Sequence, residues 1–145
     1  MKLLILAAGH MKDSPEKDLL NRYEKRLTWP LEVHEIKQET PSAEAQQFLK
    51  LLKPDSYIVS LDERGKNLST TELSDLFLHK VLPAYKYCTF IIGGADGLCN
   101  SVTSKSHLML SLGKLTWPHM LVRCLLVEQL YRIQQIQNNH PYHRN

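Results

Sequence analysis

The stretch that decides the fold is SHLMLSLGKLTWPHMLVRCLLVEQLY, residues 106–131. It opens with leucines at every second position from Leu108 to Leu112, and a period of two predicts a strand. Pro118 then begins a long apolar run, and proline suits the first helical position because its missing N–H would be unpaired there. A short loop containing Gly113 therefore joins a strand to a helix. The exposed backbone groups of this loop need water, side chains or a ligand as partners.

Apolar runs and helix-start signals alternate along the rest of the chain. Ser14 and Thr40 each precede a proline, and Ser69 lies three residues before Glu72, the spacing of a capping box. Strands are predicted at 2–8, 31–36, 57–61 and 87–92, and helices at 15–27, 41–52, 70–82, 98–106 and 118–137. This alternation predicts an α/β fold with a mostly parallel sheet flanked by helices. The length predicts one domain, residues 1–145.

Glycine-bearing turns follow three of the predicted strands. They contain Gly65 in a polar turn at 62–67, the sequence GGADG at 93–97, and Gly113. Glycine lets backbone approach a ligand closely, and in open α/β sheets ligands bind at the carboxyl ends of strands. A purely structural role for these turns is equally open. The sequence contains neither G-x-G-x-x-G nor Gly-Lys-Ser/Thr, which argues against a dinucleotide or P-loop site.

Composition indicates a water-soluble, intracellular protein. Lys and Arg exceed Asp and Glu by 18 to 15, a net charge of +3 that by itself indicates no nucleic-acid partner. The opening MKLLILAAGHMKD has a short apolar part that reads as a strand rather than a signal peptide, and no run is long enough to span a membrane. Cys88, Cys99 and Cys124 lack metal-ligand spacing. They are predicted to be buried free thiols, which fits a reducing cytoplasm.

The last helix and the tail carry the remaining signals. The helix is apolar almost all round, which favours a homodimer over a helix buried in the monomer. Arg123 interrupts it, and Glu128 and Arg132 have the i, i+4 spacing of a salt bridge. The tail, NNHPYHRN at 138–145, is a poor metal site. It reads either as a frayed end or as a polynucleotide contact made by His, Tyr and Arg side chains.

Three motifs in order resemble one known family. IIGGADGL, LSLGKLTWPHMLVRCLLVEQLYR and NNHPYHR are similar to the ribosomal large-subunit pseudouridine N3-methyltransferases of the SPOUT class. MKLLILAAGHMKD and SLDERGK also fit, so the likeness covers the whole chain and is strongest over the last 55 residues. The resemblance departs at Ala95-Asp96, where the family more often has Pro-Glu, and at Gly113, where it often has Ser.

The resemblance implies a fold and a function that the patterns alone do not. The α/β domain would carry a trefoil knot in its C-terminal part, an exception to ordinary chain connections. Loops of the knot would bind S-adenosyl-L-methionine. The enzyme would be a cytoplasmic homodimer that methylates N3 of a pseudouridine in 23S rRNA of the assembled ribosome, without a metal or a membrane. A knotted tRNA methyltransferase and a non-catalytic ribosome-binding or assembly module are the alternatives.

Matching the motifs assigns residues to this function. The donor contacts fall on the third strand's end, the glycine turn with Gly94, and the loop before the last helix: Leu61, Gly93, Leu112, Gly113, Lys114, Leu115, Thr116 and Trp117. Backbone would bind the adenine edge. Leu61, Leu115 and Trp117 would form apolar walls. The substrate side falls on the tail, with His143 as base or orienter, Arg144 as phosphate or anion contact, and Tyr142 beside them. His119 and Arg132 are secondary candidates.

Overall fold

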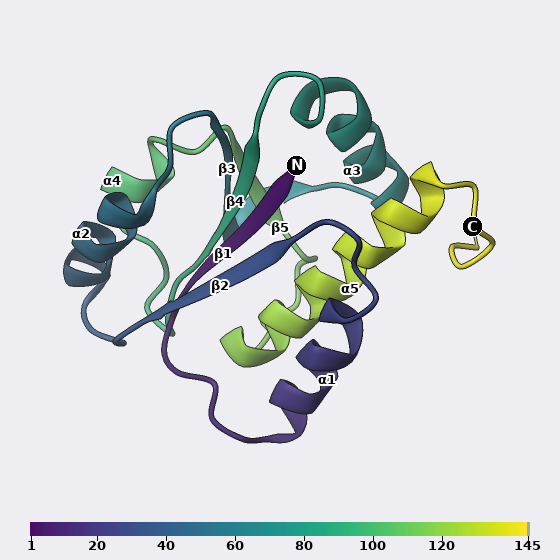
Figure 1. Cartoon of the computed structure of the whole chain (residues 1–145). Coiled ribbons are helices and arrows are strands. Elements are labelled where there is room, and N and C mark those ends of the chain that lie inside the picture. The colour runs from purple at the N-terminus through teal and green to yellow at the C-terminus, as the bar shows by residue number, and fades with distance from the viewer. Residues whose placement is uncertain (145) are drawn as a thin grey trace.

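The chain forms one five-stranded parallel sheet covered by helices on both faces (Figure 1). The computed structural model describes residues 1–144. The elements in chain order are β1 (Lys2–Ala8), α1 (Pro15–Glu24), β2 (Leu31–Ile36), α2 (Pro41–Leu51), β3 (Ser56–Asn67), α3 (Thr70–Leu76), the π-helix η1 (Phe77–Val81), β4 (Tyr87–Ile92), α4 (Asn100–Thr103), β5 (Leu108–Ser111) and α5 (His119–Gln137). The α/β fold predicted from the alternation is confirmed.

The strand order β2-β1-β4-β3-β5 places β1 and β4 in the interior of the sheet. Side chains of β1 alternate between two cores, with Leu3 and Ile5 in one and Leu6 in the other. The first core lies under α1, α3 and α5, and the second lies under α2 and α4 (Figure 1). Burial on both faces explains why these strands read as continuous apolar runs rather than alternating ones.

The helix starts follow the predicted caps. The hydroxyl of Ser14 accepts the Lys17 N–H at 3.2 Å, and that of Thr40 accepts the Ala43 N–H at 3.3 Å. Ser69 and Glu72 form the complete capping box. These contacts satisfy backbone donors that no preceding turn can reach, so each helix begins where its cap stands.

The structure corrects several element ends. The first helix stops at Glu24 rather than Leu27, the helix from Thr70 becomes π-helical at Phe77, and the predicted 98–106 helix is regular only over Asn100–Thr103. Pro118 is the N-cap of α5, with extended ψ, rather than its first helical residue. Its fixed φ serves either position, and sequence alone does not distinguish them.

The polar turn predicted at 62–67 lies inside a strand. β3 pairs with β5 through Leu61 and again through Lys66, and both residues stand opposite Leu110. Residues 62–65 therefore leave the ladder and return to it. On the return, Gly65 packs on the backbone of β5 so closely that a Cβ there would lie 2.6 Å from the Met109 carbonyl. This glycine serves a close approach of two backbones rather than a free turn.

Two of the three cysteines are buried as predicted. Cys88 lies in β4 and Cys124 in α5, and burial raises the pKa of both thiols. Cys99 is half-exposed because it caps the short α4, so its predicted burial is wrong. No helix within residues 1–144 is both long and apolar enough to cross a membrane.

Candidate functional site

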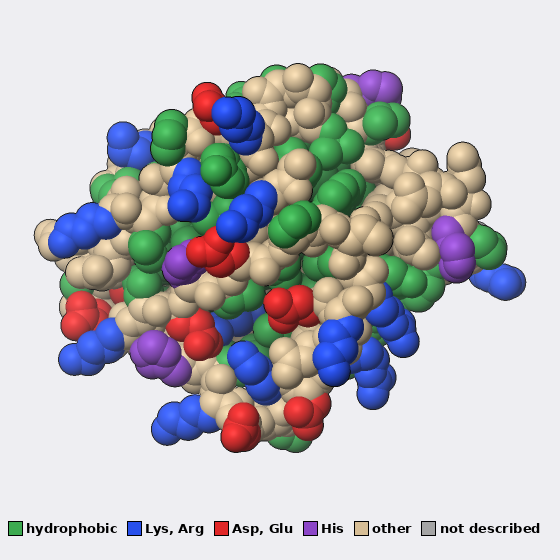
Figure 2. Space-filling view, viewed as in Figure 1, with side chains coloured by type: hydrophobic (Ala, Val, Ile, Leu, Met, Phe, Trp, Pro, Cys, Tyr) green, Lys and Arg blue, Asp and Glu red, His purple; other side chains and the backbone are tan. Residues whose placement is uncertain are grey.

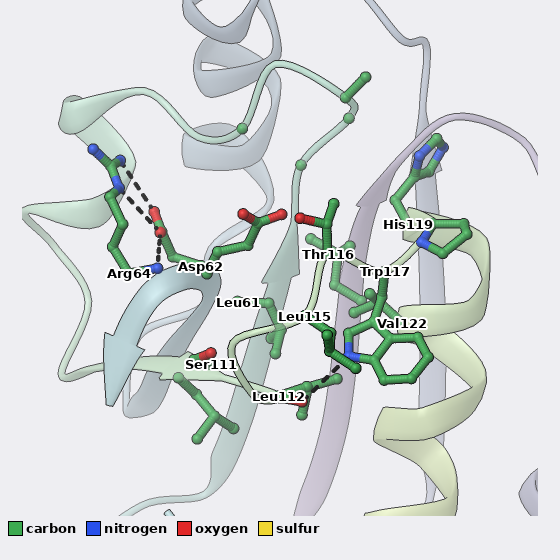
Figure 3. A pocket seen from close by; sticks show the side chains of 18 of the residues that line it. Leu61, Asp62, Arg64, Ser111, Leu112, Leu115, Thr116, Trp117, His119 and Val122 are labelled. Atoms are coloured by element: carbon green, nitrogen blue, oxygen red, sulfur yellow. Dashed lines mark hydrogen bonds and ion pairs between the residues drawn. The ribbon is translucent and has the colours of Figure 1, made fainter. Parts of the chain in front are cut away.

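A cavity of 680 Å³ opens at the carboxyl ends of β4 and β5 and at Leu61, where β3 leaves the ladder (Figure 3). Three chain segments and the start of α5 enclose it. Its lining comprises Leu61–Arg64, Ile92–Gly97, Leu110–Gly113, Leu115–His119 and Val122. The three glycine-bearing segments predicted from the sequence therefore converge, but Gly65 itself lies outside this lining.

The loop between β5 and α5 forms one wall of the cavity. Gly113 adopts φ of 111°, a conformation that disfavours other residues, and its N–H and carbonyl both bond to the Ser111 hydroxyl. The Trp117 indole N–H donates to the Leu112 carbonyl at 3.3 Å, which holds the ring across the loop (Figure 3). Leu115 remains 69% exposed and Trp117 39%. These apolar side chains suit a ligand with a planar, largely apolar part.

Backbone donors of the same loop are also unused. Across residues 1–144, no hydrogen bond is donated by the backbone N–H groups of residues 114–117. Leu115, Thr116 and Trp117 line the open cavity, so their backbone N–H groups are available to a ligand with acceptor atoms. A loop that offers apolar walls and free backbone groups together fits an adenine ring, which has an apolar face and a hydrogen-bonding edge.

The glycine turn after β4 forms the second wall. Gly94 and Gly97 make an isolated antiparallel bridge, and the Gly97 N–H donates to the Gly94 carbonyl at 3.1 Å. A Cβ on Gly93 would lie 2.8 Å from the Gly97 carbonyl oxygen. The turn is therefore closed so tightly that Gly93 accepts no side chain without opening it.

The extension of β3 supplies charged groups that the sequence assignment missed. Asp62 accepts the Arg64 N–H at 2.8 Å and pairs with its guanidinium at 3.3 Å (Figure 3). Burial pushes the pKa of Asp62 upward, but these contacts to Arg64 outweigh it and leave the pKa below its usual range. Glu63 and Asp96 also line the cavity. The polar segment after Leu61 is the available signal, but the sequence marks it as a glycine-bearing turn and assigns no role to its charged side chains.

A buried ion pair fixes the first turns of α5 behind the cavity. Arg123 is 1% exposed, donates to Glu35 at 2.6 Å, and donates to the carbonyls of Ala8 and Gly9 at 2.9 and 2.7 Å. Glu35 also accepts the Met11 N–H at 2.6 Å. Arg123 thus joins the ends of β1 and β2 to α5. The sequence showed it only as an interruption of an apolar helix.

His119 lies at the cavity beside this ion pair. Burial and the positive charge of Arg123 lower its pKa, although Glu44 opposes the shift. Its Nε2 is buried and has no hydrogen-bond partner in the described part of the chain. A neutral imidazole at this position fits the secondary role assigned to His119.

The tail lies away from the cavity of its own chain. Tyr142 donates to Glu128 at 3.0 Å, and Glu128 forms the predicted salt bridge to Arg132 at 2.7 Å. Arg132 lies 4.7 Å from the centre of the Tyr142 ring and 3.3 Å from His143 Nδ1. Burial and the hydrogen bond to Glu128 raise the pKa of Tyr142 to about 12. Contacts with α5 order at least Tyr142 and His143, so these residues are not a frayed end.

The structure brings most assigned donor residues together and separates the substrate residues from them. Seven of the eight donor positions line the cavity: Leu61, Gly93, Leu112, Gly113, Leu115, Thr116 and Trp117. The eighth, Lys114, is exposed and lies outside the lining. Tyr142, His143, Arg144 and Arg132 are also absent from it. The described residues contain no cluster of three or more potential metal ligands.

Comparison with known sequences identifies the family. A model of the family described as "Predicted SPOUT methyltransferase" matches residues 1–143. Proteins named ribosomal RNA large subunit methyltransferase H are similar over their full length. That of Rhodospirillum rubrum is 40% identical over 152 residues, covering 100% of both chains. That of Paramagnetospirillum magneticum is 39% identical over 151 residues, covering 99% of each.

Comparison with solved structures supports the fold. A probable methylase family protein from Haemophilus influenzae matches 94% of this chain and 66% of its own, with a TM-score of 0.58 and 15% identity. The SpoU methyltransferase AviRb from Streptomyces viridochromogenes, solved with AdoMet, matches 93% of this chain and 58% of its own, with a TM-score of 0.50 and 15% identity. The sequence and fold comparisons agree: this chain belongs to the SPOUT methyltransferase family, whose fold implies the C-terminal trefoil knot.

Proposed function

We propose that this protein is an S-adenosyl-L-methionine-dependent methyltransferase that modifies large-subunit ribosomal RNA. The observation that carries the proposal is the cavity at the ends of β4 and β5, with free backbone donors and apolar walls, in a chain of a methyltransferase family. The name shared by its full-length relatives supplies the substrate class. The finer proposal is N3 of a pseudouridine in 23S rRNA of the assembled ribosome, as the motif resemblance implies.

Different residues of the cavity would hold different parts of the donor. Backbone N–H groups of 114–117 would bind the adenine edge, while Leu61, Leu115 and Trp117 would cover its faces. Gly93 would let the turn pass close to the ligand. When bound, the donor supplies a methyl group on a positively charged sulfur. The chain's own contribution is to orient that group toward the target nitrogen, because positioning accounts for much of the acceleration in such transfers.

Replacing Gly93 with alanine tests this pocket. The new Cβ would lie 2.8 Å from the Gly97 carbonyl oxygen, so the turn must open and lose its shape. We expect the Kd for S-adenosyl-L-methionine, measured by calorimetric titration, to rise at least about tenfold, equivalent to about 1.4 kcal/mol. Ser101→Ala, beyond the turn, is the matched control and should bind as the wild type does. Undiminished binding by Gly93→Ala would contradict the assigned pocket, and a wild type that binds no donor would contradict the cofactor.

We further propose that the active enzyme is a homodimer in which each tail completes the partner's site. The distance along the chain supports this. α5 spans His119–Gln137 at about 1.5 Å per residue, so the tail leaves the helix about 28 Å from the cavity at its other end. Leu125, on the outer face of α5, is 37% exposed and lines a second hollow of 570 Å³ that adjoins the first at Leu112 and Trp117. A partner's helix would cover this surface.

The tail would act on the proton of the target nitrogen. N3 of pseudouridine carries a proton that must leave before or during attack, and a base or a cation favouring the anion assists its departure. His143 is our candidate base or orienter, and Arg144 our candidate anion contact. Tyr142, held by Glu128, would position both. The raised pKa of Tyr142 keeps its hydroxyl protonated and able to donate a hydrogen bond.

Mixing two inactive variants tests whether the tail acts across the dimer. His143→Ala should lose at least about 100-fold in rate, the usual contribution of a general base, and Gly93→Ala should lose activity with its donor site. In mixed dimers one cavity is intact and faces an intact tail from the other subunit. We therefore expect activity to return to a substantial fraction of the wild-type rate. If the tail serves its own chain, mixing will restore nothing, and full activity of His143→Ala would exclude His143 from the chemistry.

A methylation assay with labelled donor tests the function as a whole. Assembled ribosomes, the free large subunit, naked rRNA and tRNA are compared as substrates, and we expect label only in 23S rRNA of assembled ribosomes. Label in tRNA would favour a knotted tRNA methyltransferase, and binding to ribosomes without label would favour a non-catalytic module. A ribosome-modifying enzyme of this kind acts in the cytoplasm, and we propose that residues 1–145 function there as one domain.

A further inference from the structure

Tyrosine and arginine side chains from both ends of the chain contact one another where α1 ends. The Arg26 guanidinium lies 5.5 Å from the Tyr23 ring centre and 5.9 Å from that of Tyr131. Tyr131 in turn meets the tail's Tyr142 edge-on at 4.7 Å between ring centres. The Tyr–Arg cluster, as we call these residues together with Arg132, links the end of α1 directly to the tail.

The cluster adjoins a strip of unpaired positive charge. Arg22, Lys25 and Arg26 are exposed, and no carboxylate pairs with any of them in the described structure. The N–H of Lys25 still donates to Asn21, so the helical spacing continues and the three basic side chains share one face. Figure 2 shows Lys and Arg side chains gathering at the lower right of the molecule, where Figure 1 places α1.

The acidic group nearest the cluster is already satisfied. Glu128 accepts from Arg132 and from the Tyr142 hydroxyl, so it does not neutralise Arg26. If the contact between Arg26 and the tyrosine rings served only the fold, it would not need further unpaired charges beside it. This strip instead keeps three charges in solvent and holds one of them against aromatic rings, which restrains the guanidinium before any ligand arrives.

We propose that the end of α1 and the Tyr–Arg cluster form a docking surface for ribosomal RNA beside the modified nucleotide. This inference rests on the proposed function, because the tail reaches an active site only if that function holds. Arginine planes and tyrosine rings are surfaces on which unstacked bases lie, and the basic strip matches the phosphates of the same strand. The subunit that lends its tail would thereby also bind the RNA flanking the target. With a net charge of only +3, the chain has no broad positive field to attract the substrate, so a local basic strip of this kind would supply the attraction.

Variants of the strip test the proposal with kinetics and salt dependence. The triple variant Arg22→Gln, Lys25→Gln, Arg26→Gln should raise KM for ribosomes by about tenfold with little change in kcat. The slope of log affinity against log salt should fall by about 0.7 for each phosphate that the variant no longer neutralises. Arg26→Lys retains the charge and should keep the salt slope while losing affinity through weaker stacking. Lys53→Ala, which removes a cation lying 5.9 Å from the Tyr87 ring, is the matched control and should behave as wild type.

Two further measurements separate the proposal from its competitors. Donor binding, thermal stability and dimer mass should be unchanged in the triple variant. Loss of the dimer or of donor binding would overturn the proposal and make the cluster an internal or subunit contact. An unchanged KM and salt slope would overturn it while leaving the proposed function intact. A wild type that methylates no RNA would instead defeat the proposed function itself, and the docking surface with it.

Discussion

Arg123→Met is expected to destabilise the protein by about 3 kcal/mol, the low end for breaking a buried ion pair, because the Glu35 side chain left behind is 23% exposed. Methionine fills much of the same volume, so the loss reports charge and hydrogen bonds rather than a cavity. Glu35 would keep its charge without its guanidinium, and the carbonyls of Ala8 and Gly9 would lose their donor. Thermal unfolding should show a fall in Tm of about 10 °C.

A double variant and a pH series identify the cause of this loss. Adding Glu35→Gln to Arg123→Met removes the stranded charge, so the double variant should recover part of the stability. Burial raises the pKa of Glu35, but the Met11 N–H and the Arg123 guanidinium outweigh it and lower the pKa overall. The pair therefore stabilises the wild type above the unfolded pKa and ceases to do so as pH falls through the folded one. The difference in unfolding free energy between Arg123→Met and wild type should become smaller in that acidic range. If this difference did not change with pH, the lost stability would come from packing rather than from the ion pair.

Gly65→Ala is expected to cost about 3 kcal/mol, near the upper end for overpacking, because the new Cβ would clash with backbone atoms, which cannot move aside as a side chain can. The new Cβ would lie 2.6 Å from the Met109 carbonyl, and neither strand has a rotamer through which to relieve it. Separation of β3 from β5 would also move Leu61 and Leu110 at the cavity. Denaturant unfolding should show the loss, with donor affinity falling in parallel.

Gly94→Ala is the matched control for that experiment. A Cβ at Gly94 would meet the side chain of Gln38 at 3.2 Å, and this flexible chain can move aside. Its unfolding free energy should change much less than that of Gly65→Ala. Equal losses in the two variants would mean that glycine's conformational freedom, rather than the approach of β3 to β5, explains the requirement at Gly65.

Local signals predicted the element starts well. Ser14, Thr40 and the Ser69–Glu72 box mark helices that begin where predicted, because a cap acts through backbone atoms only a few residues away. The ends were less accurate. The change to a π-helix at Phe77 and the early stop at Glu24 have no marker within those segments, and tertiary packing commonly overrides local propensity.

Non-local contacts explain what the sequence could not provide. Residues 62–65 read as a turn because their composition is polar, whereas the return of β3 to Leu110 depends on a strand that begins some forty residues later. Likewise, Arg123 reads as a break in an apolar helix until its partner Glu35 is found, 88 residues earlier. Seven of the eight residues assigned to the donor line one cavity, and the motif resemblance, rather than periodicity, led to that assignment. The roles of those residues stay predictions.

The contact between α1 and α5 has a consequence for synthesis. Gln134 accepts the N–H groups of Thr28 and Trp29, and the Cys124 thiol donates to the carbonyl of Glu16, so the first helix is completed by the last one. During translation, the apolar face of α1 and the adjoining face of the sheet stay uncovered until nearly the whole chain has been made. The nascent chain therefore keeps this apolar surface exposed until α5 has been made, and the cavity, whose lining includes His119 and Val122 of α5, is completed only then.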